Sequence, residues 1–227
     1  MKQRLMTIAL ATALVAGAGW WVAGTTGQAP TINGQAIALP GAANAQESAA
    51  ADVTIQEMVL GAEDAPVEII EYASYTCPHC ATFHKGVFKD LKADYIDTGK
   101  VKFTYREVYF DRYGLWGSLV ARCGGEDRFF GITEMIYDTQ GEWSRAGSEA
   151  AIADELRKIG RIAGLENDQL EACLSNGDKA RGLIEWYQAN AEEHGISSTP
   201  SFVINGTTYS NMSYGEFQEI IDEKVGG

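Results

Sequence analysis

The pattern of apolar and polar positions from about residue 57 onward predicts a strand, a helix and a second strand. Residues 67–73 are mostly apolar and follow Pro66, which is typical of a strand covered on both faces. The run 101–110 is β-branched and aromatic and predicts the second strand. Between them, apolar positions at helical spacing form one stripe that ends at Gly99: Cys80, Phe83, Val87, Phe88, Leu91 and Tyr95. This order implies a parallel strand pair with a crossover helix.

The apolar spacing turns helical between about residues 112 and 192. Ser148 is suited to cap one helix, Asn167 a second, and apolar residues between 180 and 191 mark a third. The sequence therefore predicts a helical insertion after the second strand.

The last part of the chain returns to strands. Runs at 201–204 and 207–209 flank Asn205-Gly206, which is the strongest short signal for a hairpin. Ser213 and Glu216 have the spacing of a capping box and open a final helix. The predicted fold class is therefore α/β, with the order βαβ, helical insertion, ββα.

The N-terminus has the order of an export signal, with basic residues before an apolar run at 5–23. Small-residue cleavage sites lie at 16–18 and at 43–45. If neither site is cut, the run is just long enough to cross a bilayer as one helix. Residues 1–23 are therefore predicted to be a signal peptide or a membrane anchor, and both alternatives put the folded part in the periplasm.

Composition narrows the possible partners. The 227 residues carry 18 Lys and Arg against 31 Asp and Glu, for a formal net charge of −13. This balance argues against a nucleic-acid partner and against docking on anionic lipid through a basic patch. Residues 24–51 are polar and small with little periodicity, which predicts a flexible linker before a single domain at 52–227.

Candidate chemistry lies at residues 77–80, which read Cys-Pro-His-Cys where the first strand ends and the helix begins. The first turn of a helix presents unpaired N–H groups and a positive dipole end, which stabilise a reactive thiolate. Pro78 suits that turn because its missing N–H costs nothing there. Cys80 lies on the apolar stripe and is expected to be buried, which leaves Cys77 as the exposed nucleophile. A protonated His79 would lower the pKa of Cys77 further, and a low pKa makes the disulfide a stronger oxidant.

Other interpretations of the same residues stay open. Cys-x-x-Cys also binds zinc, and His84 lies four residues beyond Cys80, but the clear candidates for a fourth ligand are distant. We expect no metal site, and we expect His84 to be a helix-surface residue. The four cysteines of the chain allow three pairings.

Over about residues 57–224, the chain resembles the DsbA-like branch of the thioredoxin superfamily. The resemblance lies in the order of a strand, Cys-Pro-His-Cys, a helix, a helical insertion, and Thr199-Pro200 before a strand. The resemblance implies a thioredoxin-like fold in which Pro200 is cis and lies against the active cysteines. Thr199 and Pro200 would then line the groove that receives a substrate strand. It also implies that Glu71, six residues before Cys77, handles the proton of the inner cysteine.

The resemblance extends to the remaining cysteines. Some α-proteobacterial members carry a second, non-catalytic disulfide in the insertion, which implies the pair Cys123–Cys173; two buried free thiols are the alternative. No cofactor is implied beyond the redox-active pair Cys77–Cys80.

By resemblance, we expect a dithiol oxidase that introduces disulfide bonds into exported proteins. Its substrates would be reduced, partly unfolded proteins, a membrane quinone-linked partner would reoxidise it, and it would act as a monomer. Thr199 departs from the enteric oxidases, where valine is common, and threonine is common in isomerases and reductases. An isomerase or reductase with the same cysteines is therefore one alternative. A non-enzymatic metal carrier and an adhesion or assembly factor are two others.

Overall fold

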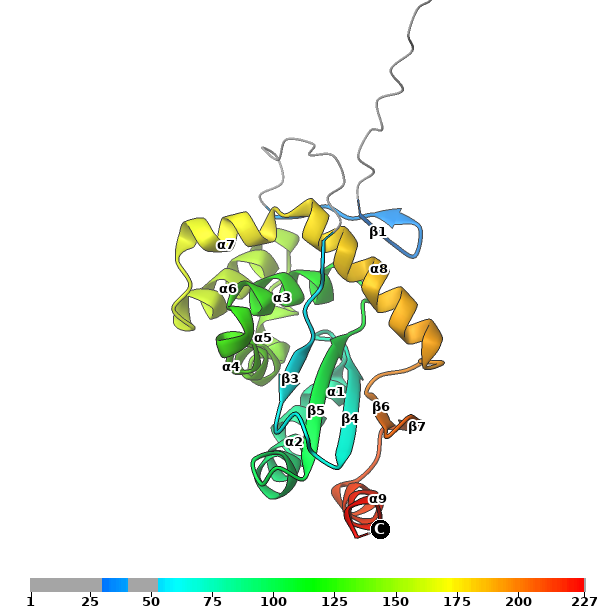
Figure 1. Ribbon diagram of the computed structural model, residues 1–227. Coiled ribbons are helices and arrows are strands. Elements are labelled where there is room, and N and C mark those ends of the chain that lie inside the picture. The colour runs from blue at the N-terminus through cyan, green and yellow to red at the C-terminus, as the bar shows by residue number, and fades with distance from the viewer. Residues whose placement is uncertain (1–29, 41–52, 227) are drawn as a thin grey trace, which may run out of the picture.

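A computed structural model describes residues 30–40 and 53–226 (Figure 1). Its main sheet has the strand order β3-β5-β4-β6-β7. The strands are β3 (Met58–Leu60), β4 (Val67–Ala73), β5 (Val101–Glu107), β6 (Ser201–Ile204) and β7 (Thr207–Ser210). β4 and β5 are parallel, as the strand–helix–strand order predicted, and the other neighbours are antiparallel. β4 is therefore the central strand, and it leads directly into the Cys-Pro-His-Cys segment.

The helix after β4 is divided, although its apolar stripe predicted one continuous element. It consists of α1 (Pro78–Lys85), α2 (Val87–Leu91) and the π-helix η2 (Lys92–Ile96). The break lies at Gly86, whose φ of −125° and ψ of −93° leave the helical region. Glycine takes this conformation readily because it has no Cβ. Beyond the bend, Val87 and Phe88 are partly buried, and Leu91 and Tyr95 are buried. The final helix, α9 (Tyr214–Val225), packs beside α2 and opens with the expected capping box.

Six helices lie between β5 and β6 in the part of the chain that the structure describes: α3 (Arg112–Cys123), α4 (Gly125–Asp138), α5 (Gln140–Trp143), α6 (Glu149–Ile162), α7 (Asn167–Leu174) and α8 (Gly177–Glu193). α3 packs against α4, α6 and α7, and α8 runs back along the sheet toward β6 (Figure 1). Ser148 caps α6 as predicted, whereas Asn167 is the first residue of α7 and Glu166 is its cap.

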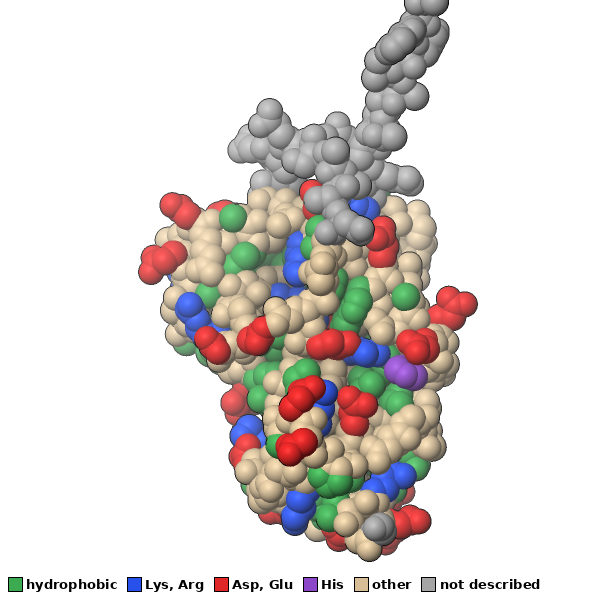
Figure 2. Space-filling view, in the orientation of Figure 1, with side chains coloured by type: hydrophobic (Ala, Val, Ile, Leu, Met, Phe, Trp, Pro, Cys, Tyr) green, Lys and Arg blue, Asp and Glu red, His purple; other side chains and the backbone are tan. Residues whose placement is uncertain are grey.

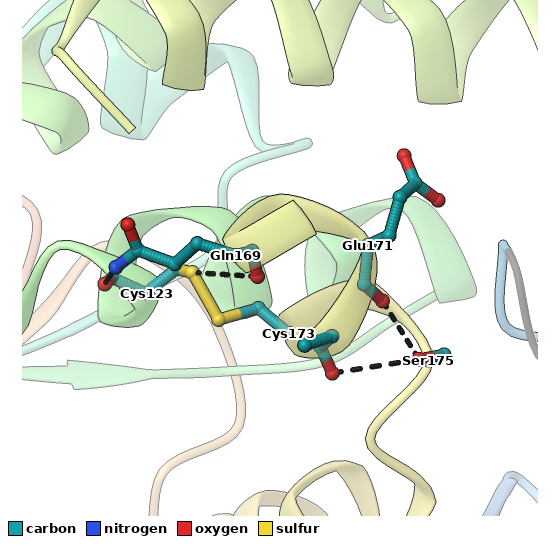
Figure 3. Close-up of a disulfide and its surroundings, with 6 residues drawn as sticks. Cys123, Gln169, Glu171, Cys173 and Ser175 are labelled. Carbon is teal, nitrogen blue, oxygen red and sulfur yellow. Dashed lines mark hydrogen bonds between the residues drawn. A yellow bond between two sulfur atoms is a disulfide. The ribbon is translucent and has the colours of Figure 1, made fainter. Parts of the chain in front are cut away.

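A disulfide joins Cys123 at the end of α3 to Cys173 in α7, with 5.9 Å between the two Cα atoms. This is the pair that the family resemblance implied. The Gln169 side chain donates a hydrogen bond to the Cys123 carbonyl beside it (Figure 3). The disulfide therefore holds two helices of the insertion together.

The prediction of a flexible linker over 24–51 is wrong for residues 30–40. They form a small hairpin of β1 (Thr31–Ile32) and β2 (Gln35–Ala36). Ile32, Ile37 and Leu39 are buried in the main core. Three aliphatic side chains within eight residues contribute enough apolar area to hold the segment against the helices.

The missed signal was Asn33-Gly34, the same dipeptide that marks the turn before β7. Both of its residues have positive φ, 51° and 76°. The predicted leader at 1–23 and the rest of the predicted linker, 24–29 and 41–51, lie outside the described residues. None of the described helices has the length and apolarity needed to cross a membrane.

The surface reflects the acidic composition. Figure 2 shows acidic side chains spread over one whole face, with Lys and Arg side chains interspersed among them. Several of these form ion pairs, such as Lys102 with Glu63 and Arg106 with Glu57. The view therefore shows no basic face suited to phosphate.

Candidate active site around Cys77 and Cys80

Cys77 occupies the N-cap of α1, and Pro78 is the first residue of the helix. The Cys77 N–H donates to the Ser74 carbonyl at 3.0 Å, which closes the turn between β4 and α1. Cys80 is fully buried, Cys77 is partly buried, and both are free thiols. Pro78 and His79 between them are exposed. The buried and accessible members of the pair are therefore those that the apolar stripe predicted.

The two thiols have opposite proton affinities. The pKa of Cys77 falls from its ordinary 9.0 to about 5, mainly because the Cys80 thiol donates a hydrogen bond to it; partial burial opposes this, and Thr199 adds to the lowering. Burial raises the pKa of Cys80 well above its ordinary value, and the negative charges of Cys77 and Glu71 add to the effect. Near neutral pH, Cys77 is therefore the thiolate and Cys80 the thiol.

The effect of a charged His79 imidazole on the pKa of Cys77 stays a prediction. The backbone N–H groups of His79 and Cys80 lower that pKa. Both N–H groups belong to the first turn of α1, where they have no partner within the helix. The helix start, rather than the identity of the His79 side chain, provides this stabilisation.

The segment Thr199-Pro200 lies opposite Cys77, and its peptide bond is cis. The Cys77 Sγ lies 3.4 Å from the Thr199 carbonyl oxygen, to which it donates a hydrogen bond only in its thiol form, and Pro200 is buried. The Thr199 hydroxyl oxygen is buried without a hydrogen-bond partner among the described residues. These residues, 122 positions apart along the chain, therefore form the two walls of one site.

Two further contacts hold the turn that carries Cys77. The Gln140 side chain, from α5, donates to the carbonyls of Tyr75 and Cys77 at 2.8 and 2.9 Å. The Thr76 hydroxyl donates to Asp111, which also caps α3. Sequence reasoning missed these residues because nothing near Gln140 in the chain indicates which loop its side chain reaches.

Glu71 is fully buried on β4, and its charge adds to the raised pKa of Cys80. Its Oε2 lies 2.8 Å from Nε2 of His84, whereas its Oε1 has no hydrogen-bond partner among the described residues. His84 is only 5% exposed, so the prediction of a helix-surface residue is wrong. Tyr137 of α4 stacks on the His84 ring, and Phe88 of α2 lies beside it. Glu68, three residues before Glu71 on the same strand, is exposed.

No group of three or more His, Cys, Asp or Glu side chains in the described ranges could hold a metal ion.

Comparisons with known proteins agree with this geometry. The family model described as thioredoxin matches residues 53–223. Disulfide bond formation protein D of Bacillus subtilis is 30% identical over 180 residues, which cover 74% of this chain and 77% of that protein. A Rickettsia bellii protein, provisionally named a protein-disulfide oxidoreductase, is 32% identical over 170 residues, or 74% of this chain. The match spans only 64% of that relative's length.

Among solved structures, Wolbachia pipientis alpha-DsbA1 superposes with a TM-score of 0.69 at 25% identity. The superposition covers 77% of this chain and 93% of that structure. A match over this much of both chains confirms the predicted thioredoxin-like fold.

Proposed function

This chain belongs to the thioredoxin family, in its DsbA-like branch, and from that premise we propose that it is a protein-disulfide oxidoreductase that introduces disulfide bonds into exported proteins. The observation that carries the proposal is the asymmetry of the cysteine pair. Cys77 has a pKa of about 5 and is accessible, whereas Cys80 is buried with a raised pKa. A thiol that is a stable thiolate leaves a mixed disulfide readily, which favours transfer of the disulfide to the substrate.

The reaction starts from the Cys77–Cys80 disulfide. A substrate thiolate attacks the Cys77 sulfur, the Cys80 sulfur leaves as a thiolate, and it takes up a proton. A second thiolate of the substrate attacks the substrate sulfur of the mixed disulfide and releases the Cys77 thiolate. The substrate then holds a disulfide, the enzyme holds two reduced cysteines, and two electrons have moved to the enzyme.

Other residues of the site have roles in the same proposal. Thr199 and Pro200 line the groove in which the substrate strand lies beside Cys77, supported by the 3.4 Å contact between Cys77 and the Thr199 carbonyl. Glu71 exchanges the proton of Cys80, since its charge already raises the pKa of that thiol. The Cys123–Cys173 disulfide is structural, because it joins two helices of the insertion.

The cellular setting is part of the proposal. The protein works as a monomer in the periplasm, to which residues 1–23 direct it as a signal peptide or an anchor. Its substrates are reduced, partly unfolded exported proteins, and a membrane quinone-linked enzyme reoxidises it. The Cys77–Cys80 pair carries the electrons without a further cofactor.

The redox potential measured against glutathione tests the proposal. We expect a value clearly more oxidising than the roughly −270 mV of thioredoxin, because the reduced form is stabilised by the Cys77 thiolate. The oxidised protein should also form disulfides in a reduced, unfolded substrate. Cys77→Ser should abolish this, whereas the paired change Cys123→Ser and Cys173→Ser should not. A potential as reducing as that of thioredoxin would contradict an oxidase.

One observation favours a second candidate, a disulfide isomerase. The Thr199 hydroxyl oxygen is buried, the Thr199 side chain adds to the lowering of the Cys77 pKa, and threonine at this position resembles the isomerases. Refolding of a substrate with scrambled disulfides separates the two. An isomerase in its reduced form restores the native pairing, whereas an oxidase in its disulfide form makes bonds without correcting them.

A further inference from the structure

The buried carboxylate that serves Cys80 has a second partner on its far side. Glu71 presents one oxygen, Oε1, that has no hydrogen-bond partner among the described residues, and its other oxygen, Oε2, lies 2.8 Å from Nε2 of His84. Both side chains are almost completely buried, with exposures of 0% and 4%. A buried carboxylate can exchange a proton with Cys80 repeatedly only if another group returns that proton.

Aromatic rings hold the His84 imidazole in one orientation. It stacks on Tyr137 from α4, with 4.4 Å between ring centroids and 18° between planes. Phe88 lies 4.7 Å away and Tyr105 5.7 Å away by the same measure. The Tyr105 and Tyr137 hydroxyls bond to each other at 2.7 Å, so they leave the histidine nitrogens free for other partners. The ring is therefore positioned by packing, and its hydrogen bond is directed at Glu71.

His84 also borders a cavity of about 270 Å³ between the α1–α2 segment and α4. Phe88, Thr133 and Tyr137 contribute to its wall, and Lys89 and Glu134 form an ion pair at its side. Both members of that ion pair are more than half exposed, so the cavity reaches solvent. Its volume accommodates several water molecules, each of which takes roughly 30 Å³. His84 thus lies between a buried acid and a site that water reaches.

We propose that His84 is a positioning residue that carries protons between Glu71 and water in this cavity, and so serves Cys80 from the side opposite the substrate groove. The inference rests on the proposed exchange through Cys77 and Cys80. When Cys80 leaves as a thiolate, Glu71 in its acid form gives it a proton. The imidazolium of His84 restores that proton, and the neutral imidazole takes another from water. Reoxidation runs the same steps in reverse, so one proton enters or leaves for each Cys80 thiol formed or consumed.

An imidazole suits this task because it has two nitrogens and exchanges protons near neutral pH. One nitrogen is committed to Glu71, which leaves the other for the solvent side. The titratable groups in contact with His84 are Glu71 on β4, Tyr105 on β5 and Tyr137 on α4. The other charged groups that line the same cavity are Glu134 and Asp138 on α4, Lys89 on α2, Lys92 at the start of η2 and Asp97 just after it.

Stopped-flow oxidation of the reduced protein by oxidised glutathione separates the relevant steps. Attack by Cys77 forms a mixed disulfide at a rate that depends on glutathione concentration. Attack by Cys80 then closes the protein disulfide at a rate that is independent of glutathione concentration. This second step requires Cys80 to lose its proton. For His84→Gln, which keeps a hydrogen-bonding group but cannot relay a proton, we expect the second rate at pH 7 to fall roughly 10-fold or more. The first rate should not change.

The pH profile distinguishes a relay from a structural role. In the wild type, the closing rate should rise with pH and then level off, because the relay supplies a base. In His84→Gln it should keep rising in proportion to hydroxide concentration. His194→Gln is the matched control, because His194 is partly exposed at the end of α8 and bonds to Tyr72 instead; it should leave both rates unchanged.

A second variant keeps the test decisive if His84→Gln alters packing. His84→Ala opens a space of imidazole shape beside the cavity, and added imidazole should restore the closing rate. Pyrazole, which has the same shape but is too weak a base, should not.

Equal closing rates and pH profiles in His84→Gln and wild type would overturn the relay. So would rescue of His84→Ala by both compounds alike, which would indicate a packing role. A wild-type protein that does not exchange with glutathione at Cys77 would instead contradict the proposed function.

Discussion

Cys77 and Cys80 are three positions apart on one helical turn, yet their surroundings give them opposite protonation. Cys77 receives hydrogen bonds from the Cys80 thiol and from backbone N–H groups at the helix start. Cys80 lies in the apolar core above the charge of Glu71. The hydrogen bond from Cys80 to Cys77 lowers one pKa and raises the other, because the shared proton belongs to Cys80. The functional asymmetry is thus a property of the pair.

A titration of the reduced protein tests this assignment. We expect thiolate absorbance at 240 nm to appear with a midpoint at about pH 5, so that Cys77 is almost entirely ionised at pH 7. Cys80→Ala should raise the midpoint, because it removes the largest stabilising hydrogen bond. Cys80→Ser, which keeps a donor, should raise it less. A wild-type midpoint near the ordinary cysteine value of about 8.5 would contradict the assignment.

At the scale of elements, the disulfide between α3 and α7 fastens the insertion. α3 lies among α4, α6 and α7, and Cys123 is its last residue. The two cysteines are 50 positions apart. A crosslink over a loop of that length restricts the unfolded chain far more than a short one does, which is the main source of its stabilisation in the chain-entropy model.

Replacing both cysteines of this bridge by serine should therefore lower the free energy of unfolding by up to roughly 4 kcal/mol. Urea unfolding of the variant and the wild type measures the difference. The pKa of Cys77 should stay the same, because neither cysteine of the bridge contributes to it. A bridge that also served the redox reaction would shift that pKa or the exchange rate with glutathione.

For the molecule as a whole, a buried ion pair joins the insertion to the sheet. Arg122 of α3 donates two hydrogen bonds of 2.6 Å to Glu107 at the end of β5, and both side chains are almost inaccessible. The same guanidinium donates to the Gln56 carbonyl and lies 5.5 Å from the Trp186 ring of α8. One side chain thus contacts three segments that lie apart in the chain: the end of β5, the stretch before β3 and α8.

Arg122→Met should destabilise the protein by roughly 3–5 kcal/mol, because it leaves the Glu107 charge buried without a partner. Combining it with Glu107→Gln should recover much of that loss, since the unpaired charge is then gone. Arg157→Ala provides the surface comparison: its partner Glu171 is 48% exposed, and the cost should stay below about 1 kcal/mol. Denaturant unfolding measures all three, and equal losses in Arg122→Met and Arg157→Ala would contradict the argument.

The sequence by itself was sufficient for most features that depend on neighbours in the chain, although the Asn33-Gly34 turn and the bend at Gly86 were missed. The central strands, the Asn205-Gly206 turn, the capping box of α9 and the division of Cys77 from Cys80 all follow from local pattern. Family resemblance added the partners Thr199-Pro200 and Cys123–Cys173, which no spacing could indicate. The fold then confirmed the thioredoxin-like class.

Only the tertiary structure decided what surrounds each side chain. His84 is polar and was predicted to lie on the helix surface, although it follows Cys80 by four residues; Tyr137 of α4 stacks on its ring, and its Nε2 bonds to Glu71. The hairpin at 30–40 lies within a longer stretch of mostly small and polar residues, yet three of its side chains complete a core built by helices much later in the chain. Helix periodicity and turn preference act over a few residues, whereas burial depends on which distant segments cover a position, and the covering segments are set by the packing of the whole molecule.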